Sequence, residues 1–159
     1  MTFDNESELY KVKEHHPTDK MVLRIRCDAK RVQCPLGIKF GALPKDAPRL
    51  VALAAKLGVD LIGVSFHVGS GCDEPEVFDG CIVIGRQIFD LAAREYGINM
   101  TLFDLGGGYP GNRGSSITPL MPSSIRPWIV TFPRASSVGH HRRTGQILRG
   151  LGLYIGHSH

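Results

Sequence analysis

One stretch indicates the fold of this chain, namely Gly63-Val64-Ser65-Phe66-His67-Val68-Gly69-Ser70-Gly71-Cys72. It is typical of a buried strand that ends in a histidine and continues into a loop of small residues with accessible N–H groups. A second predicted strand, Met100–Leu105, runs directly into Gly106-Gly107-Gly108-Tyr109-Pro110-Gly111. Consecutive glycines after a strand let the backbone approach a phosphate. The two strand ends therefore predict a site for a flat, phosphorylated ligand.

Helical patterns separate these strands from each other and from an earlier one. Residues 21–27 alternate as a strand, and apolar residues recur at helical spacing over 46–57 and 73–96, each followed by a glycine. Crossovers of a dozen residues or more require parallel strands joined by right-handed connections. The predicted class is α/β.

Two closures of such a sheet fit the pattern, an open doubly wound sheet and part of a (β/α)8 barrel. In both, ligands bind at the carboxyl ends of the strands, where His67, Ser70 and the glycines are expected to meet. A complete barrel takes about 250 residues. The 159 residues of this chain supply about half of one.

Composition narrows the class of protein. With 42% hydrophobic residues the chain can bury one core. No apolar run is long enough to cross a bilayer, and the N-terminus lacks the layout of a secretory signal. The four cysteines show no CxxC spacing, so we expect reduced thiols in a cytoplasmic protein without a membrane partner.

The net charge of +4 comes from the C-terminal end alone. Residues 115–159 contain five arginines and no acidic residue, whereas residues 1–114 hold 14 basic and 15 acidic side chains. This segment is rich in Ser, Pro, Gly and His, which predicts an irregular, disordered basic tail. A basic tail that binds RNA is the sharper alternative, but the segment lacks the interleaved aromatic residues of a single-strand binder. We therefore expect no nucleic-acid partner.

Single residues of the candidate site each have an ordinary structural explanation. A lone histidine is usually part of the core, but the place of His67 at a strand end before Val-Gly-Ser-Gly favours a functional role. Ser70 either donates to a phosphate or caps a turn. The three glycines either approach a phosphate or simply form a tight turn. Arg24 either needs an anionic partner on the inner face of its strand or faces water at an edge. No second histidine or carboxylate stands at ligand spacing from His67, so no metal site is predicted.

Residues 1 to about 114 resemble the ornithine decarboxylase branch of the barrel-fold pyridoxal-phosphate decarboxylases, which act on basic amino acids. The segments that carry the resemblance lie in the order and spacing of that family. They are Met1-Thr2-Phe3-Asp4, Val22-Leu23-Arg24-Ile25, Lys39-Phe40-Gly41, Val64–Cys72 and Asp104–Gly111. The resemblance implies a partial (β/α)8 barrel of the alanine racemase and ornithine decarboxylase type over residues 1–114, followed by a divergent tail over 115–159.

The resemblance also implies roles for individual residues. His67 matches a catalytic histidine that stacks on the pyridine ring of pyridoxal 5'-phosphate. Ser70 and Gly108 match phosphate contacts, with Gly106 and Gly107 in the same loop. Lys39 matches a lysine that forms a salt bridge across the head-to-tail homodimer. The implied reaction is decarboxylation of L-ornithine to putrescine.

Several parts of the family's machinery have no match in this sequence. These are the Schiff-base lysine, the acidic partner of the pyridinium nitrogen and the Cys-Asp motif that serves the second active site of the dimer. We therefore expect a truncated member that is inactive as an isolated chain. The alternative is a non-catalytic protein similar to the antizyme inhibitors, which act by binding antizyme.

Overall fold

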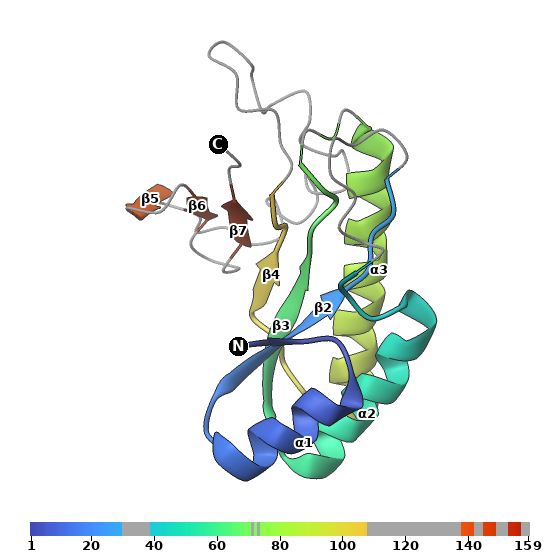
Figure 1. Cartoon of the computed structure of the whole chain (residues 1–159), viewed down its shortest axis with the longest axis vertical. Helices are drawn as coiled ribbons and strands as arrows, with labels where there is room; N and C mark the ends of the chain where they lie inside the picture. The colour runs from blue at the N-terminus through green and yellow to red at the C-terminus, as the bar shows by residue number, and fades with distance from the viewer. Residues whose placement is uncertain are drawn as a thin grey trace.

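The computed structural model describes residues 1–29, 39–70, 72 and 74–107, together with three short segments, 138–141, 145–148 and 153–156 (Figure 1). Four parallel strands and three α-helices alternate in its N-terminal part. The strands are β1 (Thr2–Phe3), β2 (Lys20–Ile25), β3 (Asp60–Phe66) and β4 (Leu102–Asp104). The helices are α1 (Glu6–His15), the 3-10 turn η1 (Pro44–Asp46), α2 (Ala47–Leu57) and α3 (Pro75–Tyr96).

The strand order decides between the two closures. Strands β1, β2, β3 and β4 lie side by side in sequence order, and each pair is parallel. Helix α1 contacts α2, and α2 contacts α3, so consecutive helices lie on the same side of the sheet. A doubly wound sheet reverses its strand order and carries helices on both faces. The arrangement is therefore a partial barrel, as the resemblance implied.

Local sequence explains where the helices begin and end. Asn5 caps α1, and its Oδ1 accepts a hydrogen bond from the Glu8 N–H at 3.1 Å. Gly58 and Gly97 follow α2 and α3 with φ angles of +62° and +66°. This left-handed conformation is strained for other residues, so the predicted helix ends are confirmed. Helix α3 begins at Pro75, two residues later than the sequence pattern indicated.

The main core fills the space between the sheet and the helices. Leu23, Val64 and Phe103 are register neighbours on β2, β3 and β4, and all three are buried. The Phe103 ring lies against Gly85 of α3, where a Cβ atom would come within 2.2 Å of the ring. A side chain at position 85 therefore displaces this ring. Among the described helices, none is long and apolar enough to span a membrane.

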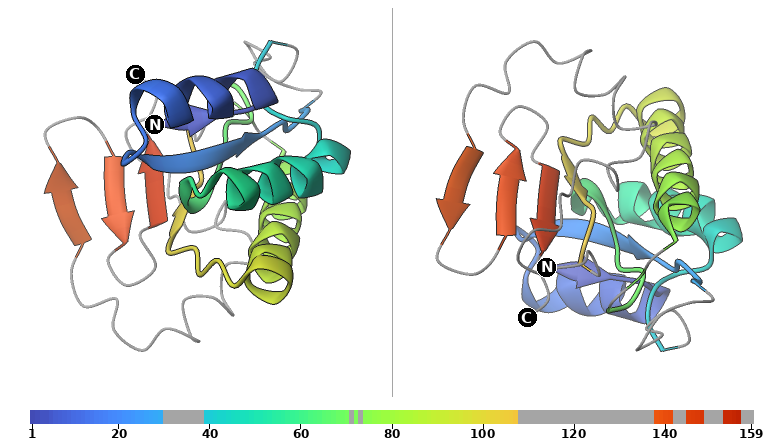
Figure 2. Two further views of the ribbon diagram at one scale, coloured as in Figure 1. Left: turned by 90° about the horizontal axis from the view of Figure 1, so that it is seen from below. Right: turned by 90° about the horizontal axis from the view of Figure 1, so that it is seen from above.

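Three short strands lie within the segment that the composition predicted to be irregular. β5 (Val138–His141), β6 (Gly145–Leu148) and β7 (Leu153–Gly156) form antiparallel pairs, and β7 pairs in parallel with β4 (Figure 2). The expectation of an irregular tail is wrong at these positions. Ile147, Tyr154 and Ile155 favour strands locally, although the segment as a whole is rich in residues that do not. The boundary at residue 114 stays a prediction.

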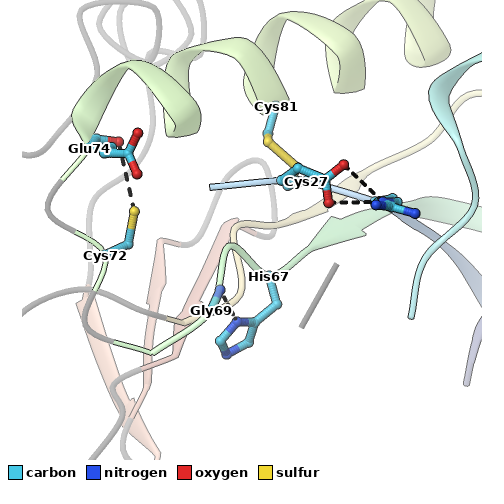
Figure 3. Close-up of a disulfide and its surroundings, with 8 residues drawn as sticks. Cys27, His67, Gly69, Cys72, Glu74 and Cys81 are labelled. Carbon is cyan, nitrogen blue, oxygen red and sulfur yellow. Dashed lines mark hydrogen bonds and ion pairs between the residues drawn. A yellow bond between two sulfur atoms is a disulfide. The ribbon is translucent and has the colours of Figure 1, made fainter. Parts of the chain in front are cut away.

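Two cysteines are paired, contrary to the expectation of reduced thiols. Cys27, which follows β2, and Cys81, in α3, form a disulfide with a Cα–Cα distance of 6.2 Å (Figure 3). They are 54 residues apart in sequence and meet where the residues after β2 lie next to α3, so sequence spacing gave no indication of the pair. Cys72 is also buried, and its Sγ lies 3.9 Å from the carbonyl oxygen of Glu74. Cys34 lies outside the described residues.

Candidate functional site

A row of polar residues crosses the sheet on the face opposite the helices. Arg24 of β2 is the register partner of Ser65 on β3, and Ser65 is the partner of Asp104 on β4. Their neighbours Phe66 and Phe103 contact each other on the helix-covered face, with ring centroids 5.9 Å apart. Because side chains alternate between faces, Arg24, Ser65 and Asp104 share the other face. All three also lie near the carboxyl ends of their strands, which is the end where a barrel binds its ligand.

His67 lies directly after β3 at the carboxyl edge of the sheet. It is half-buried, and its Nδ1 accepts a hydrogen bond from the Gly69 N–H at 3.0 Å (Figure 3). Since Nδ1 is an acceptor, the neutral ring carries its hydrogen on Nε2. Burial and, second, the positive charge of Arg24 lower the pKa of His67 below its ordinary value of 6.5. His67 is therefore a neutral, oriented ring at neutral pH.

The loop after β4 lies against the backbone that carries His67. Gly106 has a φ angle of +63°, and a Cβ atom there would lie 2.0 Å from the Phe66 carbonyl oxygen and 3.1 Å from the His67 Cα. Only glycine allows this approach. The predicted meeting of His67 with the glycine loop is therefore present at Gly106. Gly107 follows and is buried, whereas Gly108 lies outside the described residues.

Asp104 fixes the start of the glycine loop. Its Oδ1 accepts a hydrogen bond from the Gly106 N–H at 2.8 Å, which closes a tight turn. Burial raises the pKa of Asp104 above its ordinary value of 3.8, while the Gly106 hydrogen bond and the charge of Arg24 act in the opposite direction. The N–H of Gly106 is thus already used inside the protein.

Arg24 is the cation of this site. Strand β2 lies between β1 and β3, so the alternative that placed Arg24 at an edge is wrong. The guanidinium lies over the Phe40 ring, 5.1 Å from its centroid, and its charge acts on both His67 and Asp104. Phe40 in turn follows Lys39, which is exposed. Arg24 therefore links the site to the segment that carries the predicted dimer contact.

Ser65 was missed by the sequence analysis as a site residue. It is 4% exposed, and its Oγ is the one buried side-chain oxygen or nitrogen among the described residues without a hydrogen-bond partner. A buried hydroxyl without a partner is costly and points to an absent ligand or water. The register of three strands, which the sequence does not display, is what places Ser65 between Arg24 and Asp104.

The structure places the other predicted residues, Ser70 and Lys39, in the segments after β3 and before η1. Ser70 is partly buried in the loop three residues after His67, and Lys39 lies in a turn. Within the described part of the chain, His, Cys, Asp and Glu side chains form no cluster of three that could hold a metal ion. The described site thus consists of a neutral histidine, a glycine turn fixed by Asp104, a half-buried arginine and an unpartnered hydroxyl.

Comparisons with known proteins identify relatives of the whole described core. The family described as pyridoxal-dependent decarboxylase, pyridoxal binding domain, matches residues 1–129. Antizyme inhibitor 2 of Xenopus laevis is 49% identical over 140 residues, which cover 87% of this chain and 30% of the relative. Ornithine decarboxylase of Mus musculus is 48% identical over 117 residues, which cover 74% of this chain and 25% of the relative. The chain thus spans less than a third of these relatives.

The fold is found in solved decarboxylases. The arginine decarboxylase of Paramecium bursaria Chlorella virus superposes with a TM-score of 0.79 at 30% identity, covering 99% of this chain and 38% of that one. A lysine decarboxylase variant crystallised with PLP has a TM-score of 0.74 at 24% identity, covering 98% of this chain and 37% of that one. The partial barrel is thereby confirmed as the fold of this chain.

Proposed function

The chain belongs to the family of pyridoxal-dependent decarboxylases, and we propose that it forms the cofactor-binding part of an ornithine decarboxylase-like protein. The proposed reaction converts L-ornithine to putrescine and carbon dioxide. The observation that carries the proposal is the close approach of Gly106 to the backbone of Phe66 and His67, which joins the histidine and the glycine loop into one site. The 48% identity to mouse ornithine decarboxylase supports ornithine as the substrate.

The described residues fit pyridoxal phosphate. The neutral ring of His67 offers a flat face and an Nε2 hydrogen, both suited to an aromatic ligand. The turn at Gly106 leads the chain into consecutive glycines whose N–H groups suit a phosphate. The unpartnered Ser65 hydroxyl lies in the same polar row as Arg24, a cation suited to an anionic ligand. Ser70 and Gly108 are proposed as further phosphate contacts.

Each residue has a separate task in the proposed mechanism. When bound, pyridoxal phosphate takes up the electron pair released with carbon dioxide. His67 holds the ring in place without adding a positive charge, because its lowered pKa keeps it neutral. Asp104 holds Gly106 in its turn and so sets the direction of the glycine loop. Arg24 balances the charge of Asp104 and keeps the polar face attractive to anions.

The isolated chain is expected to bind the cofactor weakly and to show no turnover, because no residue of this sequence matches the Schiff-base lysine. The proposal is therefore tested in a chimera, in which residues 1–107 of this chain replace the matching segment of mouse ornithine decarboxylase. We expect release of carbon dioxide from L-ornithine and the absorbance of bound cofactor. His67→Ala is expected to lower turnover by about two orders of magnitude while far-ultraviolet circular dichroism stays unchanged.

A second candidate function is supported by the 49% identity to antizyme inhibitor 2 over 140 residues. In this case the chain is part of a binding protein whose partner is antizyme. A chimera that folds and assembles but releases no carbon dioxide contradicts the enzyme proposal. Binding of the same chimera to purified antizyme, measured by calorimetry, then supports the second candidate. Homodimer formation through Lys39 is proposed for the enzyme alone, and Lys39→Ala is expected to weaken the dimer in sedimentation.

A further inference from the structure

A cavity of about 290 Å³ lies on the helix-covered side of the sheet, away from the polar row. Its walls come from the residues after β2, from η1 and its preceding residue, and from the first turns of α3. Cys27 and Cys81 are among its lining residues, together with Leu43, Val77 and Gly80. We propose that this cavity is a thiol–disulfide exchange site, through which a small thiol reduces the Cys27–Cys81 disulfide.

Burial of the disulfide makes the cavity the route to it in the described structure. Cys27 and Cys81 are each 4% exposed, so bulk solvent barely reaches either side chain directly. Both nevertheless line a cavity whose outer wall includes the exposed Leu43. A volume of about 290 Å³ is close to the lower limit of ordinary small-molecule pockets. The cavity is therefore of a size that suits a small thiol.

The chemistry needs no group beyond the small thiol. Its thiolate attacks one cysteine Sγ, the protein S–S bond breaks, and the other Sγ leaves with the electron pair and takes a proton. A second thiol molecule attacks the resulting mixed disulfide and releases the first protein sulfur as a thiol. The protein disulfide has then gained two electrons and two protons, and two small thiols have become one small disulfide.

The position of the disulfide gives this reaction a structural consequence. Cys27 lies just past the end of β2, and Cys81 lies in α3, beyond the loop that follows His67. The bond therefore closes a segment that contains α2, β3 and His67. Reduction removes this covalent closure from the segment that carries His67. We therefore expect the state of the disulfide to affect the order of the proposed cofactor site, an expectation that rests on the proposed function.

Gly80 provides a sharp test, because it lines the cavity and a Cβ atom added there meets nothing within 4 Å. The full chain with Cys34→Ser is treated with 2-mercaptoethanol, quenched in acid, alkylated and analysed by mass spectrometry. Gly80→Leu adds a large side chain at the cavity wall and is expected to slow reduction of Cys27–Cys81 by about tenfold. Gly80→Ala is the matched control and is expected to leave the rate close to that of the parent.

The control also separates the cavity route from exchange through unfolding. Both substitutions replace a helix glycine by a better helix former, so they slow an unfolding route alike. Equal slowing by Ala and Leu, or no slowing by Leu, overturns the proposal, as does an air-oxidised chain without the Cys27–Cys81 bond. If Gly80→Leu does not fold, Leu43→Ala decides instead. It widens the cavity and is expected to speed reduction relative to Val83→Ala, an exposed change on α3 that does not line it. Equal rates for these two variants overturn the proposal.

Discussion

The two faces of the parallel sheet β1–β4 differ in chemistry although they alternate along the same strands. On the helix-covered face, Val64 and Phe103 are buried among apolar side chains. On the opposite face, Ser65 and Asp104 lie one position further along the same two strands, and both are polar. A shift of one residue thus moves a position from the packed core to the face that carries the proposed ligand site. Substitutions on the two faces should therefore affect different properties.

The largest effect is expected on the helix-covered face. Phe103→Ala removes a buried ring that contacts Phe66, Phe89 and Gly85, and it should cost about 4 kcal/mol of unfolding free energy. Urea denaturation followed by circular dichroism measures this loss. Phe40→Ala is the control, since Phe40 is 47% exposed, and it should cost below about 1 kcal/mol. Similar losses at the two positions would show that the helix-covered face is not the main core.

A smaller effect of opposite sign is expected on the polar face. Ser65→Ala removes a buried hydroxyl without a partner and should stabilise the chain by about 1 kcal/mol in the same denaturation experiment. Ser7→Ala is the control, because the Ser7 hydroxyl is exposed and bonds Asn5 Oδ1, and it should give a slight loss. A clear loss of stability for Ser65→Ala would mean that the hydroxyl supports the fold rather than a ligand.

The smallest effect concerns protonation on the polar face. The His67 ring should titrate below pH 6.5 in an NMR experiment, because burial and the charge of Arg24 both lower its pKa. Arg24→Gln removes the second cause and should raise the midpoint, although burial keeps it below 6.5. Arg49→Gln, a change on α2, should leave the His67 midpoint unchanged. A midpoint that does not change in Arg24→Gln would show that the Arg24 charge does not act on His67.

The lowered pKa of His67 also makes the free energy of unfolding depend on pH. Because the folded pKa of His67 lies below 6.5, the unfolded chain binds more protons between the two values. The contribution of His67 to stability is therefore present above pH 6.5 and is lost as the pH falls through the folded pKa. Asp104 acts in the opposite sense. Because its folded pKa lies above 3.8, its contribution to stability is present below pH 3.8 and is lost as the pH rises through the folded pKa.

Features that depend on local spacing were predictable from the sequence. The Asn5 cap, the glycines after α2 and α3, and the approach of His67 to Gly106 all follow from local patterns and from parallel strand order. Features that depend on register or on packing between elements were not predictable. Ser65 became a site residue only through its partners Arg24 and Asp104. The Cys27–Cys81 pair depends on how α3 lies across the end of β2, which no local pattern encodes.

The order of the strands in the sheet also has a consequence for synthesis on the ribosome. Each of β2, β3 and β4 pairs with the strand made just before it, so a docking partner is present when each new strand emerges. Cys27 is the exception, because its disulfide partner Cys81 is made 54 residues later. When Cys81 emerges from the ribosome, β3 and the residues around His67 have already emerged. Oxidation of this pair therefore follows the emergence of β1, β2 and β3, whereas β4 emerges later, so the bond closes a segment whose strands are already available for pairing.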